Sequence, residues 1–243
     1  MNKLYVVGIG PGDRDGMTIQ AEAAIGASEL VAGYSVYVGL IQRFFPEKPV
    51  YATGMRQERD RVEYALARAS EGITVSLVCS GDSQLYGMAG LALELSPAYP
   101  AVDIEIIPGV SAAFSGGAVL GSPLTHDFAV ISLSDLLTPM ETILKRLECA
   151  AMADFSIVLY NPSSRNRSGY LRKACEIILR HQSPTTVCGY VRNIGREDTE
   201  SVLLTLEELK NAKVDMFTTV FIGNSGSEII NGRLVTKRGY RVE

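Results

Sequence analysis

Short apolar runs alternate with segments of helical spacing through the first half of the chain. The runs at residues 4–7, 74–79 and 103–107 are rich in Val, Ile and Leu, which is typical of strands inside a parallel sheet. Around them, apolar side chains recur at the spacing of a helix in residues 18–25, 35–45, 57–70, 86–95 and 110–120. Thr18 is the predicted N-cap of the first helix, and the second strand of the chain is predicted at residues 29–33. This alternation predicts a parallel sheet flanked by helices.

The second half begins after a segment rich in Gly, Ser and Ala that Pro123 ends. Strands are predicted at residues 128–132, 156–160, 185–190, 201–204 and 217–223, and helices at residues 139–151, 168–181 and 206–210. Thr138 is the predicted cap of the first of these helices, and Asn231-Gly232 is a predicted turn. Some of these strands follow one another directly and others follow a helix, which predicts a mixed sheet with helices. We therefore expect two α/β domains, residues 1–120 and 121–243, with the active-site cleft between them.

Composition narrows the possible functions. The formal net charge is −4, whereas a general nucleic-acid binder usually carries a basic surplus. The four cysteines are scattered, without a Cys-x-x-Cys pair, so we expect no protein-bound metal. The apolar run near the N-terminus is too short for a signal peptide or a membrane span, so we expect a cytoplasmic protein.

Glycine-rich turns follow the predicted strands of the first half. They are Gly8-Ile9-Gly10-Pro11-Gly12-Asp13, Ser80-Gly81-Asp82 and Pro108-Gly109-Val110-Ser111-Ala112. Glycine allows a backbone to approach a ligand more closely than a residue with a Cβ atom. Because ligands of parallel α/β sheets bind at the carboxyl ends of the strands, these turns predict a ligand site. Three such turns are difficult to explain by chain reversal alone.

A dinucleotide site is the usual interpretation of the first turn, and two of its requirements fail. The third glycine of G-x-G-x-x-G is replaced by Asp13, and the second strand ends in Ala32-Gly33-Tyr34 without the acid that binds the ribose. The chain also lacks the G-x-x-x-x-G-K-[ST] phosphate loop. A nicotinamide dehydrogenase is therefore disfavoured.

The order and spacing of the three turns resemble those of the tetrapyrrole methylases of the cobalamin and sirohaem pathways, over the whole chain. Segments 127–139, 160–165 (Tyr-Asn-Pro-Ser-Ser-Arg) and 33–37 are similar to the members that methylate C17 of precorrin-3B or cobalt-factor III and contract the macrocycle. Two positions depart from the family pattern: Ser83 where proline is frequent, and Met140 where an aromatic residue is common. Both affect loop shape, and so the exact cofactor contacts.

The resemblance implies a two-domain α/β methyltransferase, a homodimer, and S-adenosylmethionine bound mainly by backbone groups and released as S-adenosylhomocysteine. The residues that it places at the cofactor are Gly10, Pro11, Gly81, Asp82, Leu85, Ser111, Ala112, Tyr160, Asn161, Val191 and Asn224. Asp82 has an alternative role, because an acid in this position caps a helix that begins near Tyr86.

Ring contraction requires a positioned acid or base, whereas methyl transfer from a sulfonium to an electron-rich carbon needs mainly alignment. His126, beside Asp127, is the first candidate because the ordinary pKa of imidazole suits the task. Asp13 and Ser134 are further candidates, with Asp135 next to Ser134.

The implied substrate carries many carboxylates, which an acidic protein binds through local cations. Arg165, Arg167, Arg192 and Arg196 lie in two loops of the second half, and guanidinium groups pair well with carboxylates. Ordinary solvated loop charges are the alternative. Sister methyltransferases acting at another ring carbon, a protein-methylating relative such as diphthine synthase, and a binding module without activity also stay open. The sequence does not decide whether the substrate contains cobalt.

Overall fold

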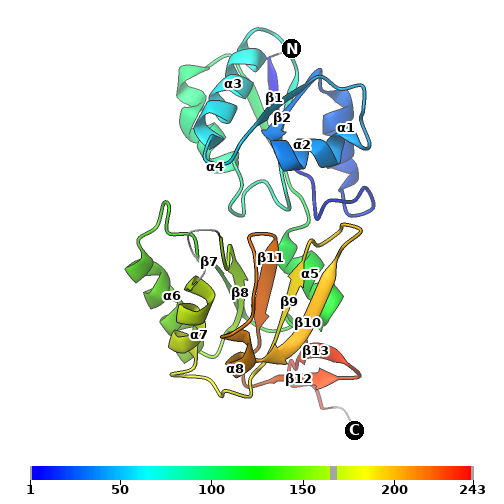
Figure 1. Cartoon of the computed structure of the whole chain (residues 1–243). Coiled ribbons are helices and arrows are strands. Elements are labelled where there is room, and N and C mark those ends of the chain that lie inside the picture. The colour runs from blue at the N-terminus through cyan, green and yellow to red at the C-terminus, as the bar shows by residue number, and fades with distance from the viewer. Residues whose placement is uncertain (1, 165–168, 242–243) are drawn as a thin grey trace. The chain divides into compact units, whose positions relative to one another are not determined.

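The computed structural model describes residues 2–164 and 169–241 and divides the chain into two compact units, Met1–Ala112 and Ala113–Glu243 (Figure 1). The division lies at the start of helix α5 (Ala112–Leu120), whereas the sequence places the boundary at the end of that helix.

The first unit contains one sheet in the order β3-β2-β4-β1-β5, and every pairing in it is parallel. Its strands are β1 (Lys3–Gly8), β2 (Leu30–Tyr34), β3 (Val50–Thr53), β4 (Val75–Cys79) and β5 (Asp103–Ile107). Its helices are α1 (Ile19–Ala27), α2 (Ser35–Gln42), α3 (Glu58–Ser70) and α4 (Ala89–Leu95), followed by a short 3₁₀ turn (Ser96–Ala98). The predicted parallel sheet is confirmed.

Alternation along the strands divides the apolar side chains of the first unit between two cores. The core that contains Val6 includes side chains of α3 and α4, whereas the core that contains Val7 includes side chains of α1 and α2. Successive side chains of a strand point to opposite faces, so β1, β2, β4 and β5 contribute to both cores. The predicted cap of α1 is present, because the Ala21 amide donates to Thr18 Oγ1 at 3.0 Å.

The second unit contains a mixed sheet in the order β10-β9-β11-β8-β7. Its strands are β7 (Phe128–Ser132), β8 (Ser156–Tyr160), β9 (Val187–Arg192), β10 (Glu200–Thr205) and β11 (Thr218–Ile222). Only the β7–β8 pairing within this sheet is parallel, which confirms the predicted mixed sheet. Its helices besides α5 are α6 (Met140–Met152), α7 (Tyr170–Ile178) and α8 (Leu206–Leu209).

The strand register gives this sheet two distinct edges at the strand ends. Ser132 pairs with Tyr160, and Arg192 pairs with Thr218, at the end that we call the Tyr160 edge. At the opposite end, Phe128 pairs with Ser156, and we call this the Ser156 edge. Because β11 runs antiparallel to β8, the residues before β11 lie at the Tyr160 edge and those after it lie at the Ser156 edge.

A small third sheet joins β12 (Ser227–Ile230), β13 (Arg233–Thr236) and β6 (Gly121–Ser122). The strands were not predicted, but the turn between β12 and β13 was. Asn231 and Gly232 both have positive φ, 50° and 74°, which is the geometry of a tight hairpin turn and confirms that prediction.

Two helix starts differ from the prediction. Helix α4 begins at Ala89, and Tyr86, where it was predicted to start, has a φ of 56° that a right-handed helix does not permit. Helix α6 has Pro139 at its N-cap position and no side-chain cap, so Thr138 does not cap it as predicted.

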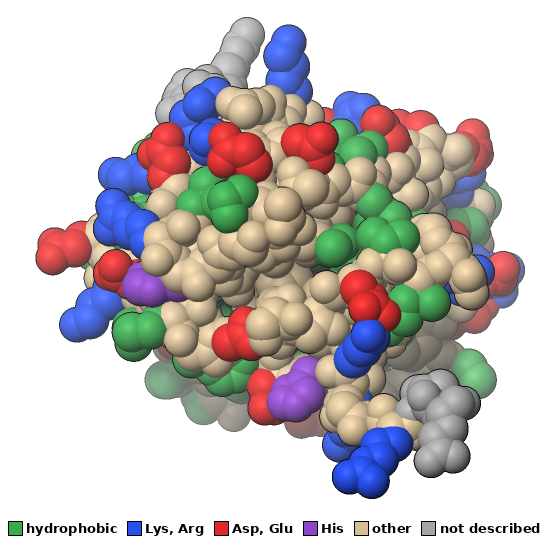
Figure 2. All heavy atoms as spheres, turned by 90° about the horizontal axis from the view of Figure 1, so that it is seen from below, with side chains coloured by type: hydrophobic (Ala, Val, Ile, Leu, Met, Phe, Trp, Pro, Cys, Tyr) green, Lys and Arg blue, Asp and Glu red, His purple; other side chains and the backbone are tan. Residues whose placement is uncertain are grey.

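None of the helices within residues 2–164 and 169–241 is long and apolar enough to span a membrane. Acidic and basic side chains are interspersed around the rim of the face in Figure 2, as the small net charge of −4 leads one to expect.

Candidate functional site

Three glycines that follow or end strands of the first unit pack against one another. A Cβ atom on Gly109 would lie 2.2 Å from the Gly81 carbonyl oxygen and 2.6 Å from the Gly8 carbonyl carbon. A Cβ atom on Gly8 would lie 2.7 Å from the Gly109 nitrogen. These distances are too short for any side chain, so Gly8 and Gly109 require glycine, whereas a Cβ atom on Gly81 would have no contact shorter than 3.5 Å. We call this contact of Gly8, Gly81 and Gly109 the glycine junction.

Backbone hydrogen bonds join the first two turns. The Gly10 amide donates to the Gly81 carbonyl at 3.0 Å, and the Gly81 amide donates to the Gly10 carbonyl at 2.8 Å. Gly10 and Gly81 have φ values of 72° and 66°, in the left-handed region that favours glycine. The predicted cofactor residues Gly10 and Gly81 therefore lie side by side.

Asp82 connects the second turn to the third. Its Oδ2 accepts from the Gly109 amide at 3.0 Å, and its Oδ1 accepts from the amides of Gln84 at 2.8 Å and Leu85 at 3.1 Å. Asp82 therefore orders its own turn. The predicted capping of a helix at Tyr86 is wrong, because the two amides that donate to Asp82 precede α4 and are not part of a helix.

The other predicted residues of the first unit border these turns. Asp13 is exposed, and its Oδ1 accepts from the Gly16 amide at 2.8 Å, which closes the first turn beside Pro11. Ser111 is buried and Ala112 half-buried, directly after the third turn. The carboxyl ends of β1, β4 and β5 thus bring together Gly10, Pro11, Gly81, Asp82, Leu85, Ser111 and Ala112.

At the Tyr160 edge of the second unit, two predicted residues occupy ordered positions. The Tyr160 hydroxyl accepts from the Ala113 amide at 2.9 Å, at the start of α5. Asn161 has a φ of 53°, and its Nδ2 donates to Ser132 Oγ at 2.9 Å. The Ser134 amide donates to the same oxygen at 3.2 Å. Tyr160, Asn161 and Ser134 therefore lie together.

The loop after Ser134 is held at one point and exposed at its tip. The Tyr170 hydroxyl donates to Asp135 Oδ2 at 2.6 Å. The next two side chains, Leu136 and Leu137, are 55% and 98% exposed. Apolar side chains this exposed, in the loop between β7 and α6, are suited to contact an apolar ligand surface.

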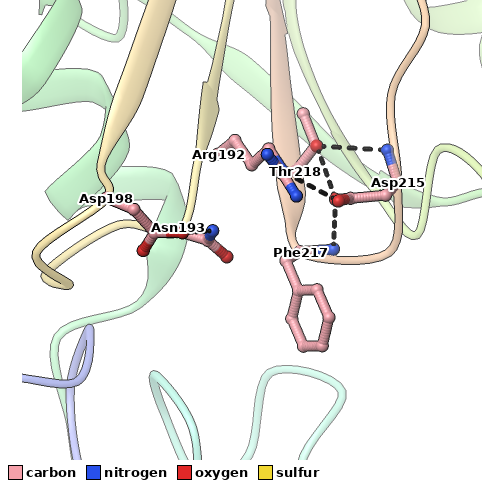
Figure 3. Close-up of polar contacts among 6 residues, drawn as sticks. All are labelled: Arg192, Asn193, Asp198, Asp215, Phe217 and Thr218. Carbon is pink, nitrogen blue, oxygen red and sulfur yellow. Dashed lines mark hydrogen bonds and ion pairs between the residues drawn. The ribbon is translucent and has the colours of Figure 1, made fainter.

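Arg192 and Asp215 form an ion pair at the same edge (Figure 3), with 2.7 Å between Nε and Oδ2. Asp215 Oδ1 also accepts from the Phe217 amide at 2.9 Å and from Thr218 Oγ1 at 3.0 Å. Burial raises the pKa of Asp215, but these hydrogen bonds, Arg192 first, outweigh burial and hold the pKa below its usual value. The same contact raises the pKa of Arg192.

Sequence reasoning missed several polar residues of this edge. Asn193 is buried with a φ of 52°, and its Nδ2 donates to Asp198 Oδ2 at 2.6 Å. The ring of Phe217 extends away from the Arg192–Asp215 pair (Figure 3), and the guanidinium of Arg196 lies 5.1 Å from its centre. The Arg192-Asn193 step at a strand end was a usable signal, since asparagine tolerates the left-handed region.

Three predicted residues of the second unit lie elsewhere. Val191 is on β9, paired with β10 and β11 on its two sides, and is fully buried. Asn224 follows β11 at the Ser156 edge and donates to the Asp154 carbonyl at 3.0 Å. His126 precedes β7 at that edge, and its Nδ1 accepts from the Asp127 amide at 2.8 Å. The length of β7 therefore separates His126 and Asp127 from Ser134.

Arg165 and Arg167, predicted to bind substrate, lie outside the described residues. Within the part of the chain that the structure describes, His, Cys, Asp and Glu side chains do not gather into a group able to hold a metal ion. The four cysteines are free thiols, and burial raises the pKa of Cys79 to about 11 and that of Cys175 to about 12.

Comparison with known proteins shows the family to which the chain belongs. Residues 3–210 match the family model of the tetrapyrrole (corrin/porphyrin) methylases. The chain is 45% identical to a probable cobalt-factor III C(17)-methyltransferase of Methanocaldococcus jannaschii, over 98% of this chain and 97% of that one. It is 39% identical to a precorrin-3B C(17)-methyltransferase of a Sinorhizobium species, over 93% and 91% of the two chains.

Solved structures show the same fold. The crystal structure of the methyltransferase CobJ superposes with a TM-score of 0.89 at 32% identity, over 96% of this chain and 99% of that one. A uroporphyrin-III C-methyltransferase from Thermus thermophilus, solved in complex with S-adenyl homocysteine, has a TM-score of 0.71 at 21% identity, over 91% and 97% of the chains. The second likeness concerns the fold alone.

Proposed function

Because the chain belongs to the tetrapyrrole (corrin/porphyrin) methylases, we propose that it methylates C17 of a tetrapyrrole and contracts the macrocycle in cobalamin biosynthesis. One observation carries the proposal: 45% identity, over nearly the full length of both chains, to a relative named for this reaction. It is an enzyme of the S-adenosylmethionine-dependent methyltransferase class, and its proposed place of action is the cytoplasm.

Cofactor-binding groups are proposed on each unit separately. The first unit supplies the turns that the glycine junction and Asp82 hold in place, where backbone groups can reach a ligand closely. The second unit supplies Tyr160 and Asn161. Val191 is a weaker member of the proposed set, because it is fully buried. Membership of the tetrapyrrole methylase family supports this assignment of the ligand class. Asn224, at the Ser156 edge, is the weakest member of the proposed set.

Methyl transfer is a displacement at the sulfonium methyl carbon. The C17–methyl bond forms with an electron pair of the macrocycle while the sulfur–methyl bond breaks and S-adenosylhomocysteine leaves. The protein supplies alignment of the two reactants, which in favourable cases lowers the barrier by about 7–11 kcal/mol. We propose that exposed Leu136 and Leu137 contact the apolar face of the macrocycle, and that Arg192 and the arginines of 165–167 bind its carboxylates.

The acid or base of ring contraction is proposed from two places on the second unit. His126 with Asp127 lies at the Ser156 edge, and Ser134 lies at the Tyr160 edge beside Asn161. Asp13, in the first unit, is exposed and already accepts from Gly16. The variants His126→Ala and Ser134→Ala separate the two places, because only loss of the true acid or base should give methylated product without contraction.

The activity test is direct. The protein is incubated with S-adenosylmethionine and either cobalt-factor III or metal-free precorrin-3B, and products are identified by mass spectrometry. We expect a product heavier by one methyl group, with cobalt-factor III the better substrate because the relative named for it is the more similar. A chain that binds S-adenosylhomocysteine but methylates neither compound would contradict the proposed reaction.

We also propose a homodimer. On α5, Phe114 and Val119 are 58% and 45% exposed. The rings of Phe114 and Phe128 meet edge to face, with 6.1 Å between the ring centres. Large apolar side chains left exposed in a single copy favour contact with a second one. Light scattering should give the mass of a dimer for the natural chain, and Phe114→Glu should shift it toward the monomer.

A further inference from the structure

A cavity of about 250 Å³ lies in the second unit, between the loop after β8, the first turn of α7 and the segment after α8. Ser163 contributes from the loop, Arg172 from α7, and Lys210, Asn211 and Lys213 from the segment after α8. The lining residues thus come from two separate parts of the sequence, and none belongs to the first unit.

The charged side chains that line this cavity are all cationic. Arg172, Lys210 and Lys213 line it, and none of its described lining residues carries a carboxylate. The chain as a whole has a net charge of −4, so such a grouping departs from its average. Two cations are already oriented: Arg172 Nη2 donates to Asn211 Oδ1 at 2.7 Å, and Lys210 pairs with Glu207 at the margin.

The start of α7 adds to this potential. The helix has nine residues, Tyr170–Ile178, and its first-turn residues Leu171 and Arg172 line the cavity. The N-cap position is Gly169, which has no side-chain acceptor for the first amides. The positive end of a helix favours an anion, and its amides supply donors.

We propose that this cavity is an anion site that binds a carboxylate group. Arg172 and Lys213 are its main ligands, and Lys210, Asn211 and Ser163 complete the set of donors. The planar guanidinium of Arg172 binds a carboxylate through two parallel hydrogen bonds, and Lys213 adds a second positive charge beside that carboxylate. The volume admits a short acidic side chain and not a macrocycle.

Two sources can supply such a carboxylate. One is a peripheral acetate or propionate of the tetrapyrrole, an origin that rests on the proposed function. The cavity shares the residue segment 160–164 with Tyr160 and Asn161, which connects it to the Tyr160 edge. The other source is a free carboxylic acid, for which the cavity would be independent of the methyl transfer.

The test uses the full chain with Arg172→Gln, Lys213→Gln and both together, and Lys173→Gln as the matched control on the same helix. Lys173 is exposed and does not line the cavity. Calorimetry measures the affinities for cobalt-factor III, for tricarballylate as a free carboxylate probe, and for S-adenosylhomocysteine. Melting curves confirm that the variants fold.

We expect the double variant to lose about ten- to a hundredfold in affinity for cobalt-factor III, as befits lost charge-assisted hydrogen bonds. Its affinity for S-adenosylhomocysteine should stay at the natural value, and Lys173→Gln should change neither. If only tricarballylate binding falls, the site is supported and its ligand is a free acid. If the double variant binds both carboxylate ligands as tightly as the natural chain, the site is overturned.

The experiments can contradict the anion site and the proposed methyl transfer independently of each other. Absence of methyl transfer by the natural chain would contradict the function, while saturable tricarballylate binding that the double variant lacks would still support the anion site. Normal methyl transfer with unchanged carboxylate affinities in the double variant would retain the function and remove the site.

Discussion

The Gly109 amide donates to Asp82 Oδ2 at 3.0 Å, so a carboxylate after one strand holds the turn that follows another. The same carboxylate closes its own turn through Gln84 and Leu85. The arrangement of the glycine turns in the first unit therefore depends on one ionised side chain as well as on backbone contact.

Asp82→Asn should weaken binding of S-adenosylhomocysteine by about tenfold, because an amide retains only one acceptor oxygen and its hydrogen bonds lack the charge. Calorimetry measures the affinity. Glu94→Gln, an exposed change of the same kind on α4, is the control and should bind normally. Equal affinities for Asp82→Asn and the natural chain would show that the third turn holds its position without Asp82.

Gly109→Ala should destabilise the chain by about 2 kcal/mol or more, because its Cβ would lie 2.2 Å from a carbonyl oxygen and the backbone must shift. Gly26→Ala is the matched control: Gly26 lies in α1 with no atom near the new Cβ, and the change should stabilise by roughly 0.5–1 kcal/mol. Urea denaturation measures both. A Gly109→Ala chain as stable as Gly26→Ala would contradict the glycine junction.

Asp215 should make stability depend on acid pH. Its pKa in the folded chain lies below the ordinary value, so its contribution is present at neutral pH and is lost as the pH falls below about 4. The difference in free energy of unfolding between the natural chain and Asp215→Asn should therefore shrink between pH 6 and pH 3. Arg192→Gln should reduce the same difference in part, because Phe217 and Thr218 still donate. A difference independent of pH would contradict this interpretation.

Leu137→Ser should weaken tetrapyrrole binding by about tenfold without loss of stability, because the side chain is 98% exposed in the chain alone and is proposed to be buried by the macrocycle. Met152→Ser, at an apolar side chain that is 67% exposed at the end of α6, is the control. Absorbance titration with cobalt-factor III measures both affinities, and equal values would remove Leu137 from the binding surface.

Most of the fold could be predicted because its strands are short apolar runs bounded by strong turn residues. Strands β5, β7 and β8 begin and end where the pattern places them. Helix α4 starts late because Asp82 and Tyr86 keep the preceding residues in turns, a preference that apolar spacing does not reveal. The strands β12 and β13 are short and partly exposed, so their apolar pattern is too weak to predict them. Only the Asn231-Gly232 turn between them could be predicted.

The candidate site was less predictable, since it depends on which strand ends share an edge. The three glycine turns follow parallel neighbours and meet as expected. In the mixed sheet, the direction of each strand decides the edge, and the antiparallel course of β11 takes Asn224 to the Ser156 edge. The Arg192–Asp215 pair joins segments that approach only through strand pairing, so the sequence gives no local signal for it.

The glycine junction also bears on how members of such a family diverge. Because the contact is between main-chain atoms, no second substitution nearby can restore what a side chain there would remove. Mutational tolerance should therefore be close to zero at Gly8 and Gly109 whatever the genetic background. Acceptance of a new macrocycle should instead evolve through the side chains of the Tyr160 edge, where one replacement can offset another.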